Sequence, residues 1–181
     1  MKRPYQKNPE KFYVEMYTAG RICLFANPSC SARIVDALKW ICERKGLRLY
    51  NYVILPDCLV MICNTAWGVL PEALDGFQKF TSKALVRMLR QGSKSLQKSW
   101  IFPVLNEASK MGNLDYITIW DQSFEPVSMF RQEETDIKAG FIESLPVRKG
   151  FVDKPEHFKN SSANPDNPLS GWVVEPTDRG I

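Results

Sequence analysis

Residues 47–63, LRLYNYVILPDCLVMIC, contain two apolar runs rich in β-branched and aromatic residues, with a Pro-Asp pair between them. Such runs are typical of strands, and the Pro-Asp pair is typical of a tight turn. We therefore predict a hairpin whose strands cover residues 47–55 and 58–63. The elements predicted on either side of it decide which fold the hairpin belongs to.

Before the hairpin, residues 12–20 (FYVEMYTAG) alternate partially and predict a strand that ends at Gly20. Asn27-Pro28-Ser29 supplies a turn and a helix cap. A helix is predicted from about residue 31 to residue 45, because apolar side chains recur there at helical spacing, and Gly46 ends it.

After the hairpin, a second helix is predicted over about residues 71–91. Its expected buried stripe has spacings of three and four residues and consists of Phe77, Phe80, Ala84 and Met88. The remaining pattern predicts a helical piece at 97–112, short strands at 116–120 and 124–129, and a helix at 132–143.

The order strand, helix, strand, strand, helix, strand is typical of a ferredoxin-like α+β fold. We expect an antiparallel sheet with helices on one face and an appended C-terminal helix. A length of 181 residues with 44% hydrophobic residues suits one core. We assign residues 1–152 to this domain and residues 153–181, rich in Pro, Asn, Ser and Lys, to an extended C-terminal tail.

The net charge of +4 is unevenly distributed. Residues 76–100 contain no acidic residue, so the rest of the chain carries a net charge of −2. The six basic residues of this segment are Lys79, Lys83, Arg87, Arg90, Lys94 and Lys98. On a helix turning about 100° per residue their spacings follow one stripe. Gly92 is expected to interrupt the helix, so we expect only Lys79, Lys83, Arg87 and Arg90 to share that face. The stripe is either a binding surface for phosphates or only the solvated side of an amphipathic helix.

Histidine and cysteine usage restricts the possible chemistry. His157 is the single histidine, which excludes sites that need two. Five cysteines without a C-x-x-C pair favour reduced thiols, and Cys58 and Cys63 fall on opposite faces of one strand. No secretory signal or membrane-length apolar run is present, so we expect a cytoplasmic protein without a membrane span.

Several segments, in this order, resemble the single-tyrosine HUH-type transposases, particularly the branch of REP-associated tyrosine transposases. Residues 52–62 look like that family's Tyr-x-x-Met-Pro-Asn-His-x-His-Leu strand pair. Residues 77–83, FQKFTSK, resemble its basic Phe-Lys-x-Phe-Thr-Ser-Lys helix. The other matching segments are LFANP at 24–28, IWDQ at 119–122, FIESLPVRKGFV at 141–152 and NSSA at 160–163.

The resemblance implies a DNA transposition and recombination enzyme of mobile elements that has lost its chemistry. In the family, two histidines hold a divalent metal, and a tyrosine attacks the scissile phosphate to give a covalent link to single-stranded DNA. Cys58 and Val60 stand at the histidine positions, Phe141 at the tyrosine and Leu145 at a further polar metal ligand. We therefore expect no strand cleavage, no metal and no other cofactor. A stray thiolate ligand at Cys58 and residual nuclease activity remain alternatives.

With the cleavage chemistry lost, the function that the resemblance still implies is DNA binding. We expect single-stranded or hairpin DNA as the partner and a homodimer as the assembly. The predicted DNA-binding residues are Lys79, Lys83, Arg87 and Arg90, with Arg148 and Lys149 added to the same surface. The alternative is a protein-interaction or regulatory dimer without DNA binding, or a partner of an active transposase.

Overall fold

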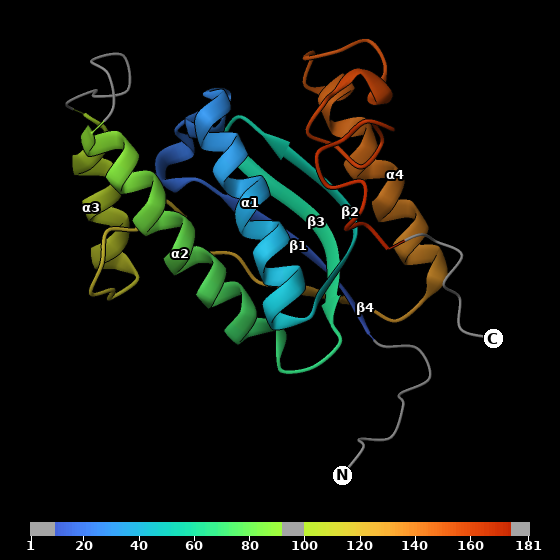
Figure 1. The fold of residues 1–181 in the computed structure, drawn as a ribbon, viewed down its shortest axis with the longest axis horizontal. Coiled ribbons are helices and arrows are strands. Elements are labelled where there is room, and N and C mark those ends of the chain that lie inside the picture. Colours follow the sequence, from blue (N-terminus) through green and yellow to red (C-terminus); the bar gives the residue numbers. More distant parts are fainter. Residues whose placement is uncertain (1–9, 92–99, 175–181) are drawn as a thin grey trace.

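The computed structural model describes residues 10–91 and 100–174. Its fold is α+β, as predicted, and is built on a four-stranded antiparallel sheet in the order β2-β3-β1-β4 (Figure 1). In chain order the strands are β1 (Lys11–Tyr17), β2 (Leu47–Leu55), β3 (Cys58–Thr65) and β4 (Val127–Met129).

The predicted hairpin is confirmed, with Pro56 and Asp57 forming the turn between β2 and β3. β3 is central and pairs with β1 on its other side, so that Glu15 lies opposite Val60 and Tyr17 opposite Cys58. Because side chains alternate along a strand, Cys58 and Val60 point to the same face of the sheet.

Two long helices, α1 (Pro28–Lys45) and α2 (Leu70–Gln91), pack on one face of the sheet and enclose the larger core. The predicted cap is present, since the Asn27 side chain accepts a hydrogen bond from the Ser29 N–H at 2.9 Å. Gly46 ends α1 at φ 69°, a conformation that favours glycine. The shorter α3 (Ile101–Met111) lies beside α2 (Figure 1).

The appended helix α4 (Gln132–Arg148) covers the opposite face of the sheet (Figure 1). A second apolar cluster forms beneath it, in which Ile142 and Leu145 of α4 meet Val53, Val60 and Ile62 of the sheet. The sheet is therefore covered on both faces, and each face carries its own apolar cluster.

The segment after α4 packs along β2, the edge strand. It contains a short 3₁₀ turn, η3 (Pro155–His157). The N–H of Ile54 donates to the Asn160 carbonyl at 2.9 Å, and the buried Tyr52 hydroxyl donates to the Asn167 side chain at 2.8 Å. These bonds cover part of an edge that would otherwise expose unpaired backbone groups.

The structure corrects the stripe predicted to be buried on α2. Phe77 is buried, but Phe80 is exposed, and Ala84 and Met88 are only half-buried. The buried face instead combines apolar Leu85, Val86 and Leu89 with two polar residues. The Trp120 indole N–H donates to Thr81 Oγ1 at 2.8 Å, and the Ile119 N–H donates to Ser82 Oγ at 3.2 Å. An apolar spacing rule misses a face that is buried through hydrogen bonds.

Residues 116–120 do not form the predicted strand. Their one sheet-like contact is an isolated bridge between Thr18 and Trp120. Side-chain hydroxyls hold the segment instead, as in the bond from the Thr118 N–H to Ser109 Oγ at 2.9 Å. Of the strand predicted at 124–129, only residues 127–129 pair. Among the described residues, no helix combines the length and apolar character needed to cross a membrane.

Candidate functional site

The four positions at which the resemblance places lost chemistry converge in the structure. Cys58 and Val60 lie on β3, and Phe141 and Leu145 lie about one turn apart on α4. All four belong to, or pack against, the apolar cluster between α4 and the sheet. Val60 is 0% exposed and Phe141 is half-buried, and these residues of β3 and α4, more than eighty positions apart in sequence, meet in one apolar cluster.

These side chains do not fit a divalent metal. Val60 and Leu145 carry no ligand atom, and burial raises the pKa of the Cys58 thiol to about 12. The thiol is therefore protonated at neutral pH, whereas the thiolate is the form that ligates metals. Within the described ranges there is no group of three or more His, Cys, Asp or Glu side chains that could hold a metal ion. His157 is exposed on η3.

Phe141 occupies a position framed by cations. Its ring centroid lies 5.7 Å from Lys138 Nζ and 5.4 Å from the Arg148 guanidinium. Such contacts favour an aromatic ring whether or not it carries a hydroxyl. Phe141 itself has no hydroxyl and cannot act as a nucleophile.

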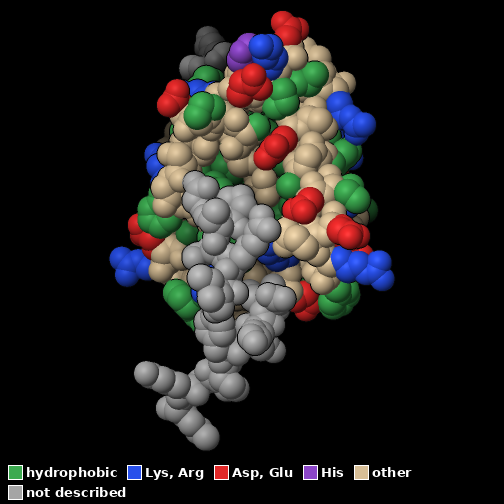
Figure 2. All heavy atoms as spheres, turned by 90° about the vertical axis from the view of Figure 1, so that its right-hand side faces the viewer, with side chains coloured by type: hydrophobic (Ala, Val, Ile, Leu, Met, Phe, Trp, Pro, Cys, Tyr) green, Lys and Arg blue, Asp and Glu red, His purple; other side chains and the backbone are tan. Residues whose placement is uncertain are grey.

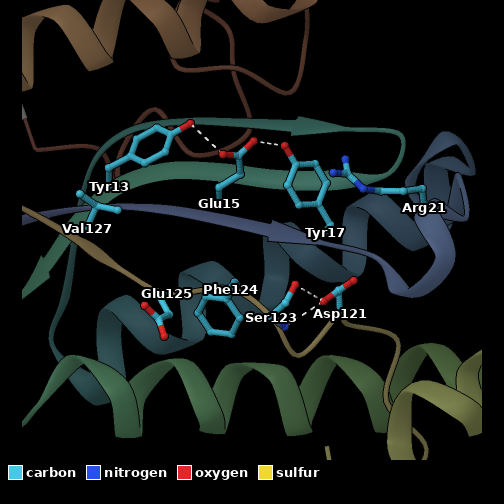
Figure 3. Close-up of a pocket in the computed structure, with 9 residues that line it drawn as sticks. All are labelled: Tyr13, Glu15, Tyr17, Arg21, Asp121, Ser123, Phe124, Glu125 and Val127. Atoms are coloured by element: carbon cyan, nitrogen blue, oxygen red, sulfur yellow. Dashed lines mark hydrogen bonds between the residues drawn. The ribbon is translucent and has the colours of Figure 1, made fainter. Parts of the chain in front are cut away.

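A polar network on β1 adjoins Cys58 and Val60. The hydroxyls of Tyr13 and Tyr17 both donate to the Glu15 carboxylate (Figure 3). The Arg21 guanidinium lies 3.1 Å from the Tyr17 ring centroid and 3.6 Å from the Asp57 carboxylate. The sequence-based search missed this network. Its signal is an acid at the centre of an alternating aromatic run, Tyr13-x-Glu15-x-Tyr17.

The network borders a hollow of about 310 Å³, with Asp121, Ser123, Phe124 and Glu125 on its other side (Figure 3). Among the described residues that line it, Glu15, Asp121 and Glu125 are acidic and Arg21 is the one cation. Hydrogen bonds from the Ser123 hydroxyl and N–H lower the pKa of Asp121, which keeps that carboxylate ionised. A hollow with this charge repels phosphate groups.

The cations predicted on α2 form an exposed stripe, consisting of Lys79, Lys83, Arg87 and Arg90. Three of them line a groove of about 380 Å³ that the structure places between α2 and the segment around Tyr116. The groove-lining residues are Lys83, Val86, Arg87, Arg90, Gln91, Tyr116 and Ile117. Lys94 and Lys98, the two basic residues after Gly92, lie outside the described residues.

The stripe is not uniformly available to a ligand. Lys79 Nζ lies 3.9 Å from the Asp115 carboxylate, an exposed pair that contributes little to stability. Arg90 lies 5.9 Å above the Phe102 ring. For Lys83 and Arg87, no carboxylate within the described ranges lies within ion-pair distance. These two cations are the strongest candidates for phosphate contacts.

Arg148 and Lys149 do not extend the α2 stripe, contrary to the prediction. They follow one another where α4 ends, and α4 lies on the other side of the sheet from α2 (Figure 1). Figure 2 shows the side of the molecule that is on the right in Figure 1, where basic side chains are interspersed with acidic and apolar ones. The prediction grouped Arg148 and Lys149 with the α2 cations because of their charge alone, and charge does not specify on which face of the sheet a residue lies.

Structure comparison matches this chain to a REP-associated tyrosine transposase bound to a REP hairpin. The TM-score is 0.60 at 12% identity, over 98% of this chain and 93% of that chain. The two proteins share a fold. A putative transposase from Deinococcus radiodurans also matches, with a TM-score of 0.46 and 14% identity, over 80% of this chain and 97% of that one. No protein-family model matches the sequence, and no curated protein sequence matches it.

Proposed function

We propose that this protein binds single-stranded or hairpin DNA along α2 and does not cleave it. The observation that carries the proposal is the groove in which Lys83 and Arg87 face solvent beside Tyr116. Phosphate neutralisation by Lys and Arg provides most of the affinity of a protein for DNA, and it needs neither a metal nor a nucleophile. The transposase that shares this fold is bound to a hairpin, which supports the same class of ligand here.

The proposal that the protein does not cleave DNA is based on the residues between the sheet and α4, on the face opposite α1 and α2. Val60 and Leu145 are buried apolar residues, Cys58 is a buried protonated thiol, and Phe141 has no hydroxyl. The neighbouring hollow is acidic, so it disfavours a scissile phosphate. Binding and the lost chemistry therefore belong to opposite sides of the molecule.

The salt dependence of binding tests the proposal. We expect the affinity for a labelled hairpin and for a linear single strand to fall as salt rises. For single strands the slope of log affinity against log salt is about −0.7 per neutralised phosphate. The three groove cations then predict a slope near −2, or about 15-fold weaker binding at 200 mM than at 50 mM salt. Fluorescence anisotropy measures it, and binding that does not respond to salt contradicts the proposal.

A separate assay tests for strand cleavage. We expect hairpin DNA incubated with the protein and Mg²⁺ or Mn²⁺ to remain intact and to form no covalent protein–DNA adduct on a denaturing gel. The physical reason is that Phe141 has no hydroxyl and that the part of the chain described by the structure places no metal-ligand set around Val60. A covalent adduct, or a product that depends on added metal, contradicts this half of the proposal and leaves DNA binding intact.

The competing function is docking of a protein partner or of a second copy on the same groove. Weak binding to DNA at low salt, together with retained binding to a partner after the cations are removed, favours that alternative. The homodimer stays a prediction of the resemblance, to be tested by the mass of the protein in solution.

A further inference from the structure

We propose that Trp40 and Phe80 form a stacking platform for an unpaired nucleobase. The inference rests on the proposed function and deepens it, because it specifies single-stranded rather than fully paired DNA as the ligand. It assigns a role to an exposed aromatic pair that lies on the face of α1 and α2 turned away from the sheet.

The two rings come from different helices and lie almost parallel. Their centroids are 5.9 Å apart and their planes differ by 7°. Trp40 is 41% exposed and Phe80 is 48% exposed. Large aromatic side chains contribute much of the energy of cores and interfaces. Because more than two fifths of each of these side chains is exposed, the pair offers apolar surface that a ligand can contact.

The pair adjoins the cations that line the α2 groove. Lys83 and Arg87 follow Phe80 by three and seven residues, which places them beside it on a helix that turns about 100° per residue. On α1, the exposed Arg44 follows Trp40 by four residues and so lies one turn away from it. Asp36 and Glu43 also lie about one turn from Trp40 on α1, four residues before it and three after it, so the net positive charge beside the rings comes from α2.

This combination of charge and ring faces matches single-stranded DNA. Proteins that bind single strands combine a positively charged track for the backbone with aromatic rings on which successive bases stack. Lys83 and Arg87 fit the first role, and Trp40 with Phe80 fits the second. In a duplex the base faces are stacked on each other, so the platform adds nothing to duplex affinity. An apolar protein partner would satisfy the rings and leave the flanking cations without a counter-charge.

The experiment compares two probes of equal charge. One is a 12-nucleotide thymidylate strand, and the other has abasic sites in place of its bases. We expect the wild-type protein to bind the first probe about 10-fold more tightly, since one stacked base contributes a factor of roughly 5 to 150. Trp40→Ala and Phe80→Leu should remove that preference, whereas Trp40→Phe, which restores a ring, should retain most of it.

The outcomes separate the platform from the proposed function. If wild type binds both probes equally, or if Trp40→Ala keeps the preference, the platform is wrong even though salt-dependent binding persists. If neither probe binds at low salt, the proposed function itself fails. Binding of the abasic probe by Trp40→Ala at the wild-type level shows that the variant is folded, because this probe reads only the cations.

Discussion

Val60→His is expected to destabilise the protein by about 2–3 kcal/mol, although histidine is what the resemblance places at this position. Val60 is fully buried in the apolar cluster under α4. An imidazole there is larger than the valine and brings a polar ring into a dry site. The cross-strand neighbour Glu15 already accepts from Tyr13 and Tyr17. Thermal denaturation should show a midpoint lowered by about 5–10 °C.

Two matched variants separate the causes of this loss. Val60→Thr keeps the shape and exchanges one γ-methyl for a hydroxyl, so it measures the cost of a buried polar group without the added volume of an imidazole. Val69→His makes the same exchange at a valine that is 53% exposed, and there we expect a change within about 0.5 kcal/mol. A Val60→His protein as stable as wild type would mean that the position retains a polar pocket, against the apolar packing described above.

The parts of the fold that sequence predicts best have local causes. The Pro56-Asp57 turn marks the hairpin, and Asn27 and Gly46 mark the two ends of α1. The burial pattern of α2 is not set locally, because Thr81 and Ser82 are buried against hydrogen-bond partners around Trp120, although Thr81 also donates to the Phe77 carbonyl within the helix. Their polarity predicts exposure until those partners are placed. Tertiary context decides in such cases.

The candidate site shows the same division. The α2 stripe follows from helical spacing alone, and the structure leaves all four of its described cations exposed. The grouping of Cys58 and Val60 with Phe141 and Leu145 needed either the resemblance or the structure, because β3 and α4 are far apart in sequence. The Trp40–Phe80 pair joins two helices, and no spacing rule within one helix reveals it. The prediction that Arg148 and Lys149 extend the α2 stripe is wrong for the same reason, because charge alone does not indicate which face of the sheet a helix covers.

Charge reversal on α2 is expected to have the largest effect on function. Lys83→Glu with Arg87→Glu changes the groove by four charge units and places carboxylates where phosphates would lie. We expect affinity for the hairpin and the linear strand to fall about 100-fold or more at 50 mM salt. The remaining salt slope should be shallower than −1, because Arg90 is then the one unreversed cation among the described residues that line the groove. Both residues are exposed, so circular dichroism should show a folded protein.

The matched control reverses the same number of charges on the other side of the sheet. Arg148→Glu with Lys149→Glu alters the net charge of the whole chain by the same amount, at positions that lie on α4 and directly after it. If DNA lies along α2, this variant should bind within about threefold of wild type, because charges farther apart than a Debye length are largely screened. Equal losses in both double variants would show that net charge, and not the groove, governs binding. A loss confined to Arg148→Glu with Lys149→Glu would move the DNA to the α4 face and overturn the assignment of the groove.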